Sequence, residues 1–568
     1  MAARGEKVSR NARIEFPTLL PGRMACWGGV PGVALRLASL DPRLMSGTTT
    51  IGAGTLAVNG SIPTGGIGCG RLTRREDYPG WAGESAAAPA TSRRGRFSKR
   101  QHPLPMNHTS CPDCRPEMEP FSRRALLKTL SCGFGYLAFA GLATRAAAAE
   151  NPLAPKAPHF PARAKRVIFL TMRGGPSHVD TFDYKPQLTA DTGKPGKRPG
   201  TQLLGSKWKF AQSGKSGLWI SELFPNVAKH ADELCLVRSM QTDLPSHPQA
   251  FMKMHTGNFQ FVRPSLGAWS LYGLGTENEN IPGFITITPP NGFGGAQNYG
   301  SAFLPAIYQG QRIGQENRPI AGAEVRNLET QLSPAAQRTE LELVQSLNRE
   351  KLARDRVNSE VEGVIESYEL AFKMQGQMPQ VMDLAKESAA TQKLYGIGDA
   401  ATDDFGRKCL LARRFIEAGV RFVEVSHGNW DHHFNLRAAL GNSARAGDLP
   451  IAGLLSDLRA RGLLKDTLVV WAGEFGRTPH AQGGDGRDHN NKAFTVWMAG
   501  GGVRGGLSYG QTDEYGYEAV ENKVQIHDLH ATLLALIGLD HEKLTYRYAG
   551  RDFRLTDVHG NVVKEIIA

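Results

Sequence analysis

Cysteine is scarce in most of the chain. Of the seven cysteines in 568 residues, five precede residue 150, and only Cys235 and Cys409 follow it. Two cysteines in so long a stretch cannot form a disulfide framework, so a disulfide-stapled fold is excluded. Cys111 and Cys114 have the spacing of metal ligands, but no second pair follows them, and a structural zinc site needs four ligands.

Residues 150–568, which hold few cysteines, also carry almost no excess positive charge. The net charge is +13, yet residues 1–149 hold 20 lysines and arginines against 9 acids, whereas the remainder holds 47 against 45. The remainder therefore has no concentrated basic stripe for binding a polyanionic backbone. We expect no nucleic-acid partner.

The candidate membrane segment is short. The apolar run from Thr129 to Ala143 is interrupted by three glycines and falls below the ~20 residues that cross a bilayer. It follows a charged stretch, Ser122–Lys128, and precedes the small residues Ala146–Ala149, which is the order of a secretory leader. A transmembrane anchor is the alternative, but we expect a signal peptide over 106–149 that is cleaved, and no stable membrane anchor.

The stretch Ser122-Arg-Arg-Ala-Leu-Leu-Lys128 resembles a twin-arginine export signal. The resemblance implies export of a folded chain by the twin-arginine translocation machinery, to the periplasm or the outside of the cell. Residues 1–105 are rich in Gly, Arg, Ala and Ser and show no sustained helical or strand period. We expect residues 1–105 to be disordered or not translated, with translation starting at Met106.

Apolar strands alternate with helices in the rest of the chain, after a Pro- and Ala-rich linker at 150–164. The pattern predicts a helical insertion at about 334–400, within a domain spanning 165–568. The expected strands are 166–172, 233–237, 284–288, 421–425, 467–471 and 495–498, and the expected helices are 404–418, 448–461 and 530–537. Such alternation predicts the α/β class, with a mainly parallel sheet covered by helices on both faces.

Acids and histidines gather where these strands end. In α/β proteins, the carboxyl ends of strands are where ligands bind, and carboxylates with imidazoles suit a divalent ion. A lone histidine in a loop is usually solvated, and His527 with Asp528 can simply cap the last helix. The candidate metal ligands are His178, Asp180, His427, Asp431, His433, Glu474, Asp488 and His489.

The order of these features resembles the alkaline phosphatase and sulfatase superfamily. The resemblance implies an alkaline-phosphatase-like sandwich with a first-strand ligand, a nucleophile, an Asp–His pair, an acidic ligand and a final histidine. On this chain those positions are Asp180, the 246–257 region, Asp431 with His433, Glu474, and His489.

The chain more closely resembles a large, uncharacterised family of bacterial sulfatase-like proteins with twin-arginine signals. This likeness covers about residues 165–568 and implies a fold but no established reaction. It rests on the motifs Gly174-Gly-Pro-Ser-His-Val-Asp-Thr-Phe-Asp183, Arg263-Pro-Ser-Leu-Gly-Ala-Trp269, Trp430-Asp-His-His433, Gly473-Glu-Phe-Gly-Arg-Thr-Pro479, Gly486-Arg-Asp-His489 and His527-Asp-Leu-His-Ala-Thr532.

The chain departs from the sulfatase pattern in three places. Formylglycine sulfatases need a cysteine or serine in a cys-x-pro-ser-arg segment, but here the nucleophile position falls on His247, with Ser246 beside it. The tip of the first strand has no pair of aspartates, and Glu474 lacks the histidine that normally follows the acidic ligand. We therefore expect no formylglycine chemistry.

Three mechanisms remain open from the sequence. Ser246 could be a metal-activated nucleophile, His247 could take the attack or be a ligand, or a metal-bound hydroxide could attack directly. Arg173 or Arg477 could hold a sulfate or phosphate oxygen, because guanidinium binds oxyanions bidentately. A salt bridge to a neighbouring acid is the alternative for Arg477.

We therefore expect an exported, metal-dependent hydrolase of sulfate or phosphate esters, with a small-molecule or polysaccharide substrate. The expected cofactor is a divalent metal ion, with Zn, Ca, Mg and Mn all open. The alternative is a non-catalytic relative that binds a polysaccharide-associated substrate, because the nucleophile motif is missing and the acidic site is altered.

Overall fold

The computed structural model describes residues 151–568 except 324, 326–327, 329, 331 and 356–358. The expected leader at 106–149 and the segment 1–105 lie outside the described residues. The stretch 151–164 has neither helix nor strand, but it lies along the fold. The backbone N–H of Lys156 donates to the carbonyl of Leu274, that of Arg163 donates to Leu536, and Ala164 is buried. In the described part of the chain, no helix has the length and apolar character needed to cross a membrane.

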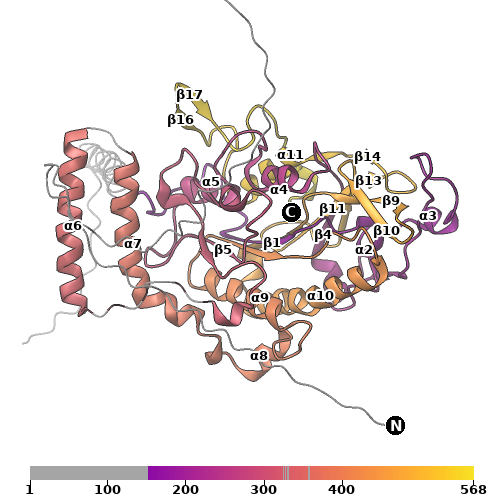
Figure 1. The fold of residues 1–568 in the computed structure, drawn as a ribbon, viewed down its shortest axis with the longest axis horizontal. Helices are drawn as coiled ribbons and strands as arrows, with labels where there is room; N and C mark the ends of the chain where they lie inside the picture. The colour runs from indigo at the N-terminus through magenta and orange to yellow at the C-terminus, as the bar shows by residue number, and fades with distance from the viewer. Residues whose placement is uncertain (1–150, 324, 326–327, 329, 331, 356–358) are drawn as a thin grey trace, which may run out of the picture. The chain divides into compact units, whose positions relative to one another are not determined.

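A nine-stranded sheet forms the centre of the fold, in the order β12-β4-β11-β8-β1-β7-β5-β6, with β15 also paired to β4 (Figure 1). The strands are β1 (Arg166–Met172), β4 (Leu234–Gln241), β5 (Phe284–Ile287), β6 (Gln311–Ile313), β7 (Phe422–His427), β8 (Thr467–Ala472), β11 (Phe494–Ala499), β12 (Leu507–Tyr509) and β15 (Val524–Gln525). Only β11 is antiparallel to its neighbours in this sheet. The sheet is therefore mainly parallel.

Helices cover both faces of this sheet. One face packs against α9 (Asp403–Glu417) and α10 (Leu436–Ala460), and the other against α4 (His247–Thr256), α5 (Leu266–Leu274) and α11 (Ile526–Leu536). Because successive strand residues point to opposite faces, Ile168 and Leu170 of β1 join the first core, whereas Val167 and Phe169 join the second. The α/β class and the mainly parallel sheet expected from the sequence are confirmed.

The strands lie within a few residues of the expected ranges, but α10 differs from the expected helix at 448–461. It begins twelve residues earlier, at Leu436. Leu436, Leu440 and Ala444 recur at helical spacing and are buried, which extends the helix, and Pro450 lies inside it. Asp448 therefore lies inside this helix, and its carboxylate accepts the backbone N–H groups of Asn226 and Val227.

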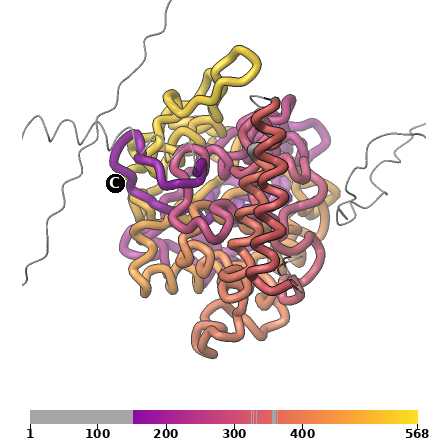
Figure 2. Tube along the Cα trace, turned by 90° about the vertical axis from the view of Figure 1, so that its left-hand side faces the viewer, coloured from indigo at the N-terminus to yellow at the C-terminus, as the bar shows by residue number. Residues whose placement is uncertain are grey.

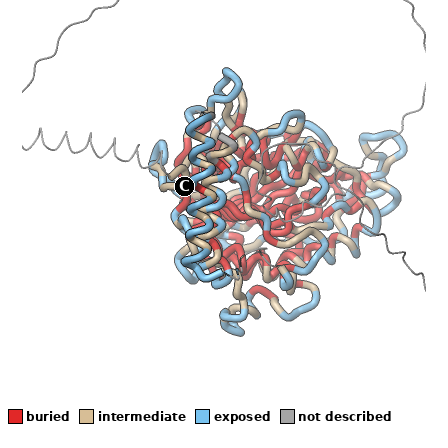
Figure 3. Tube along the Cα trace, turned by 60° about the vertical axis from the view of Figure 1, so that its left-hand side comes forward, coloured by how far each residue is buried: buried red, intermediate tan, exposed pale blue. Residues whose placement is uncertain are grey.

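Helices α6 (Pro334–Asp355), α7 (Ser359–Met382) and α8 (Ala389–Leu394) lie in the range 334–400, where the sequence pattern predicts helices (Figures 1 and 2). The side chain of Gln345 on α6 donates to the carbonyl of Ile365 on α7. The end of α7 joins the core through Met374 and Met378. The outer side of α6 is exposed, whereas the central strands of the sheet, such as β8 and β11, are buried (Figure 3).

The reversed strand β11 brings separate parts of the chain to one edge of the sheet. Strands β1, β4, β7 and β8 all end at this edge, and β11 begins there. The hairpin of β9 (Gly476–Gln482) and β10 (Gly486–Asn490) lies between β8 and β11 in the chain. The polar segments after β1, β4, β7 and β8 therefore meet the hairpin at the same edge.

The smaller strands form separate antiparallel pairs. These are β2 (Phe210–Ser213) with β3 (Leu218–Ser221), β13 (Gln511–Thr512) with β14 (Ala519–Glu521), and β16 (Tyr546–Tyr548) with β17 (Arg551–Phe553).

Candidate metal centre

Four side chains from three segments converge at the edge where β1, β4, β7 and β8 end. They are His247, the first residue of α4, Asp431 and His433 in the loop after β7, and His489 on β10. Each contributes one nitrogen or oxygen atom, and these atoms all lie within 4.8 Å of one another. Over the described residues, this is the one group of three or more such side chains with that geometry. We call these four residues the metal cluster.

Each histidine of the metal cluster has its Nδ1 atom held by an acceptor outside the cluster. His247 Nδ1 donates to Glu474 Oε1 at 2.5 Å, and His433 Nδ1 donates to Gln482 Oε1 at 2.5 Å. His489 Nδ1 donates to the carbonyl of Pro245 at 2.8 Å. A neutral imidazole that donates from Nδ1 keeps a lone pair on Nε2, which is how metal-binding histidines are oriented.

The three Nε2 atoms face one another and the carboxylate of Asp431. His433 Nε2 lies 2.9 Å from His489 Nε2. Asp431 Oδ1 lies 2.8 Å from His433 Nε2, 3.2 Å from His247 Nε2 and 3.4 Å from His489 Nε2. Lone pairs at these distances repel unless a cation lies between them. Ligand atoms about 2.1 Å from a tetrahedral zinc lie about 3.4 Å apart, so the spacing and the donor set fit a divalent ion.

Glu474 lies one contact away from the cluster. Its carboxylate is buried and accepts the backbone N–H of Gly174 at 2.9 and 3.1 Å, in addition to His247 Nδ1. Both oxygens are therefore engaged on the side of His247 that faces away from Asp431. In this geometry Glu474 orients a histidine and does not join the cluster.

Arg477 holds Asp431 in place. Its side chain is 1% exposed, and Nη2 donates to Asp431 Oδ1 at 2.5 Å. The remaining N–H groups face the carbonyls of Gly174, Gly175 and Arg487 and, at 3.4 Å, the ring of His433. This guanidinium has no free donor for a substrate, so the salt bridge is the geometry observed.

Asp431 is ionised in this setting. Burial alone would raise its pKa, but the polar contacts with His247 and His489 and the charge of Arg477 outweigh burial and hold the pKa well below the usual value. The side chain is 43% exposed, so one side of the cluster remains open to solvent. The same two carboxylates, of Asp431 and Glu474, raise the pKa of His247 against the opposing effect of its burial.

The local sequence explains how these segments come so close. Gly174 has φ +114°, and a Cβ atom there would lie 2.6 Å from the backbone nitrogen of Asp431. Only glycine allows both this conformation and this approach. On the hairpin, Arg477 is paired directly with His489, so both side chains lie on the same face.

Two candidate ligands from the loop after β1 lie outside the cluster. His178 Nε2 donates to the carbonyl of Gly516 at 2.9 Å, and burial lowers its pKa. Asp180 is fully buried and forms a bidentate ion pair with Arg487 at 2.6 and 3.1 Å. The short helix α2 (His178–Thr181) directs both side chains away from the cluster.

His427 and Asp488 also lie outside the cluster. His427 Nδ1 accepts the indole N–H of Trp430 at 2.9 Å, and burial with nearby Lys408 lowers its pKa to about 3. Asp488 accepts the backbone N–H of its neighbour His489 and the guanidinium of Arg198.

Ser246 and Arg173 lie next to the cluster but are engaged elsewhere. Ser246 precedes α4, and its hydroxyl donates to Gln249 Oε1 on the same helix. Arg173 Nη1 pairs with Glu316 Oε1 at 2.5 Å, and its guanidinium lies 5.3 Å from the centre of the Phe293 ring.

Three groups that build this site could not be identified from the sequence. Gln482 and the Pro245 carbonyl orient two of the histidines, and Phe293 packs on the third with ring centres 5.1 Å apart. An amide, a carbonyl and a phenyl ring are common everywhere in proteins, so only the folded arrangement identifies them.

Comparison with known families places the chain. The model of the family described as "Protein of unknown function (DUF1501)" matches residues 164–567. The chain belongs to this family. No match is found among curated proteins.

Several solved structures overlap the chain in part. The PsFucS1 sulfatase from Pseudoalteromonas sp. is 14% identical, with a TM-score of 0.30, over 67% of this chain and 69% of that one. The phosphonate monoester hydrolase SpPMH from Silicibacter pomeroyi is 10% identical, with a TM-score of 0.31, over 66% and 73%. The TAB5 alkaline phosphatase mutant with bound Mg is 12% identical, with a TM-score of 0.27, over 60% and 92%. Likenesses at this level assign neither an activity nor a ligand to this chain.

Proposed function

We propose that this chain is a metal-dependent hydrolase of sulfate or phosphate esters, without formylglycine. The observation that carries the proposal is the convergence of three Nε2 lone pairs on the Asp431 carboxylate. Three imidazoles and one carboxylate favour a transition ion such as Zn or Mn over Ca or Mg, which prefer oxygen ligands.

The residues around the cluster have separate roles in this proposal. His247, Asp431, His433 and His489 hold the ion, which when bound polarises an ester oxygen and lowers the pKa of water. Glu474 keeps the Nδ1 proton on His247, and Arg477 fixes the direction of the Asp431 carboxylate. The exposed side of Asp431 gives the ester and water access to the cluster.

Water is the attacking group in this proposal. The Ser246 hydroxyl donates within its own helix, and His247 presents Nε2 to the cluster while Nδ1 is held by Glu474. Neither side chain is poised as a nucleophile. Of the mechanisms that the sequence leaves open, direct attack therefore agrees best with the geometry.

Metal analysis combined with turnover tests the proposal. The full chain should retain about one divalent ion per molecule and hydrolyse 4-nitrophenyl sulfate or 4-nitrophenyl phosphate. His489→Ala should lose both, whereas Asp488→Asn, one residue away and outside the cluster, should lose neither. A folded chain that binds no divalent ion after reloading refutes the proposal.

A non-catalytic binding protein is the second candidate. Four protein ligands complete a tetrahedral zinc shell, and closed shells of this kind are usual in structural sites. A chain that holds its ion but hydrolyses neither ester, while still binding a sulfated sugar, would establish this second function instead.

We also propose that the chain is exported with its metal bound, through the twin-arginine leader at 106–149. Support comes from the leader's resemblance and from the two described cysteines, Cys235 and Cys409, which are buried free thiols. Burial raises the pKa of both thiols, that of Cys235 to about 12, so both remain protonated and unreactive. Substituting lysines for Arg123 and Arg124 should keep the chain in the cytoplasm, as cell fractionation would show; unchanged export would refute this route.

A further inference from the structure

A cavity of about 330 Å³ lies beside the metal cluster, where β5 and β7 end. One wall is formed by Gly428 and Asn429, two residues before the cluster member Asp431. The charged and ring-bearing side chains that line it are Arg173, Glu316, Arg318, Asp404, Lys408 and His427. We call this space the β7 cavity.

The acids of the β7 cavity are already neutralised by contacts around it. Glu316 pairs with Arg173 at 2.5 Å and accepts the backbone N–H of Asn291 at 2.8 Å. Asp404 pairs with Lys408 at 2.7 Å and accepts the backbone N–H of Ile320 at 2.7 Å.

The cavity also contains donors that these acids do not use. Among the described residues, no carboxylate lies within ion-pair distance of Arg318. His427 accepts from Trp430 at Nδ1 and has a pKa of about 3, so it is neutral and carries its hydrogen on Nε2. With three cations against two occupied carboxylates, the cavity favours a negatively charged group.

One aromatic ring connects the cavity to the metal cluster. The Arg173 guanidinium lies 5.3 Å from the centre of Phe293, and the His247 ring stacks on Phe293 at 5.1 Å. A Cβ atom on Gly428 would lie 2.5 Å from Arg173 Nη2, so glycine leaves the space that the guanidinium occupies. Because Arg173 and His247 contact the same ring, the β7 cavity and the metal cluster are adjacent. One substrate can therefore occupy the cavity and the cluster together if its two charged groups are close to each other.

We propose that the β7 cavity binds a second anionic group of the ester substrate, a sulfate, phosphate or carboxylate next to the group at the metal cluster. This proposal rests on the hydrolase function and narrows its substrates to esters with at least two negative charges. Lys408, Arg318 and the neutral His427 supply the hydrogen bonds, and Arg173 supplies charge at the junction with the cluster.

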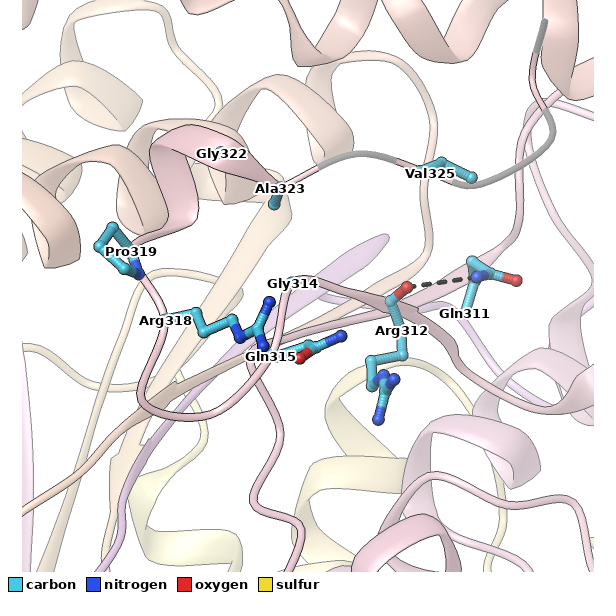
Figure 4. A pocket seen from close by; sticks show the side chains of 9 residues that line it. All are labelled: Gln311, Arg312, Gly314, Gln315, Arg318, Pro319, Gly322, Ala323 and Val325. Atoms are coloured by element: carbon cyan, nitrogen blue, oxygen red, sulfur yellow. Dashed lines mark hydrogen bonds between the residues drawn. The ribbon is translucent and has the colours of Figure 1, made fainter. Parts of the chain in front are cut away.

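A larger cavity of about 710 Å³ adjoins the β7 cavity and shares Arg318 and Pro319 with it. Figure 4 shows Arg312, Gln315 and Arg318 along the stretch from β6 to Pro319. Arg312 lines only this larger cavity. It therefore provides a matched control for Arg318.

The chain offers a second matched pair on α9. Lys408 pairs with Asp404 at 2.7 Å and lines the β7 cavity, while Arg407, the adjacent residue, pairs with Asp403 at 2.8 Å and does not line it. Both ion pairs join residues four apart on the same helix. Substitution by glutamine removes one such pair in each case.

Calorimetric binding to the full-length chain tests the proposal. The chain would be used with its ion bound, and the probes are non-hydrolysable sulfonate analogues of a disulfated disaccharide and of its monosulfated form. Lys408→Gln and Arg318→Gln should each weaken binding of the disulfated probe about tenfold, the loss of one charge-assisted hydrogen bond. Arg407→Gln and Arg312→Gln should change it less than about twofold. The monosulfated probe should respond to none of the four.

The outcomes separate this proposal from the hydrolase function. Equal binding by all four variants overturns the subsite, even if the wild-type chain hydrolyses esters. A loss in Arg312→Gln as large as in Arg318→Gln, without a loss in Lys408→Gln, moves the ligand to the larger cavity and also overturns it. Selective loss in Lys408→Gln and Arg318→Gln supports the subsite, and a wild-type chain without turnover would then be a dianion-binding protein.

Discussion

Glu474 could act either as a metal ligand or as a group that only orients a ligand, and a substitution there can distinguish the two roles. Sequence order suggests a metal ligand, whereas its carboxylate contacts His247 Nδ1 and the backbone of Gly174. Removing a group that orients a ligand typically weakens metal binding 10- to 100-fold without abolishing it.

Glu474→Gln should therefore weaken metal binding about 10- to 100-fold but leave one ion bound at saturation. Competition with a chromogenic chelator measures the affinity, and Asp431→Ala, which removes a cluster member, provides the comparison. Equal and complete loss of metal in both variants would make Glu474 a ligand and contradict the geometry.

A buried ion pair lies beneath the cluster and joins α4 to β7. His255 Nε2 lies 3.2 Å from Glu424 Oε1, with side chains 3% and 1% exposed, and His255 Nδ1 donates to the carbonyl of Phe251. Burial alone would lower the pKa of His255, but Glu424 outweighs it and raises the pKa. The pair holds the helix that begins with His247.

Glu424→Gln should lower the free energy of unfolding by about 1–3 kcal/mol near neutral pH, since a buried histidine loses its charged partner. A raised folded-state pKa gives stability that is complete below the unfolded value of 6.5 and is lost as pH rises through the folded value. Urea unfolding should therefore show falling stability above neutral pH in the wild type and a flatter profile in the variant. Parallel profiles would show that the pair does not titrate there.

Some of the metal ligands predicted from the sequence lie in the cluster and others lie outside it, and the direction of their side chains is the reason. Asp431, His433 and His489 follow or precede strands that meet at one edge, so order along the chain was informative. His178 and Asp180 follow a strand at the same edge, but the turn of α2 points them toward Gly516 and Arg487. A strand's end predicts where a residue lies, but not where its side chain points.

At the scale of elements, the approach of one loop to another depends on glycine. Gly174 combines φ +114° with a Cβ position 2.6 Å from the Asp431 nitrogen. Gly193 has a similar φ of +89°, with nothing within 4 Å of its Cβ position. Comparing alanine substitutions at the two glycines therefore separates the effect of backbone strain from the effect of steric contact.

Gly174→Ala should destabilise the fold by about 1–3 kcal/mol through strain and also weaken metal binding, because the Asp431 backbone must move. Gly193→Ala should cost stability alone. Thermal unfolding and metal affinity, measured on both variants, give the comparison. Similar metal affinity in the two alanine variants would mean that the contact at Gly174 does not position Asp431.

Element boundaries were less predictable than element types. Strands such as β1 and β8 are mostly apolar runs, and those runs located them. The sequence did not predict the early start of α10, because Asp448 and Pro450 together resemble the beginning of a helix. In the folded chain the Asp448 carboxylate instead accepts backbone N–H groups of another segment, which the local sequence does not reveal.

For the molecule as a whole, strand and helix alternation was sufficient to predict a mainly parallel sheet between two helical layers. The reversed direction of β11 was not predictable, because an apolar strand reads the same in either direction. That reversal brings the β9–β10 hairpin, with Arg477 and His489, to the edge where the other strands end. The site thus depends on a feature of topology that the residue pattern does not encode.

The whole fold also buries histidines that are neutral, and this sets its behaviour in acid. Burial lowers the pKa of His427 and His530 to about 3 each, and His530 is fully buried with Nε2 donating to the carbonyl of Met254. In the unfolded chain both would titrate near 6.5, so the unfolded state binds more protons as pH falls below that value. As pH falls below 6.5, each histidine should therefore reduce the free energy of unfolding by up to about 1.4 kcal/mol per pH unit.

His530→Gln tests this directly, because glutamine keeps an N–H for Met254 and cannot bind a proton. Few carboxylates titrate between pH 6.5 and pH 5. In this range the free energy of unfolding should fall less steeply with pH in the variant than in the wild type, and the two slopes should differ by the contribution of about one proton. Urea unfolding in the presence of a chelator, at several pH values, gives both slopes free of metal binding. Identical slopes would mean that His530 is already protonated in the folded chain, which its single acceptor and closed surroundings argue against.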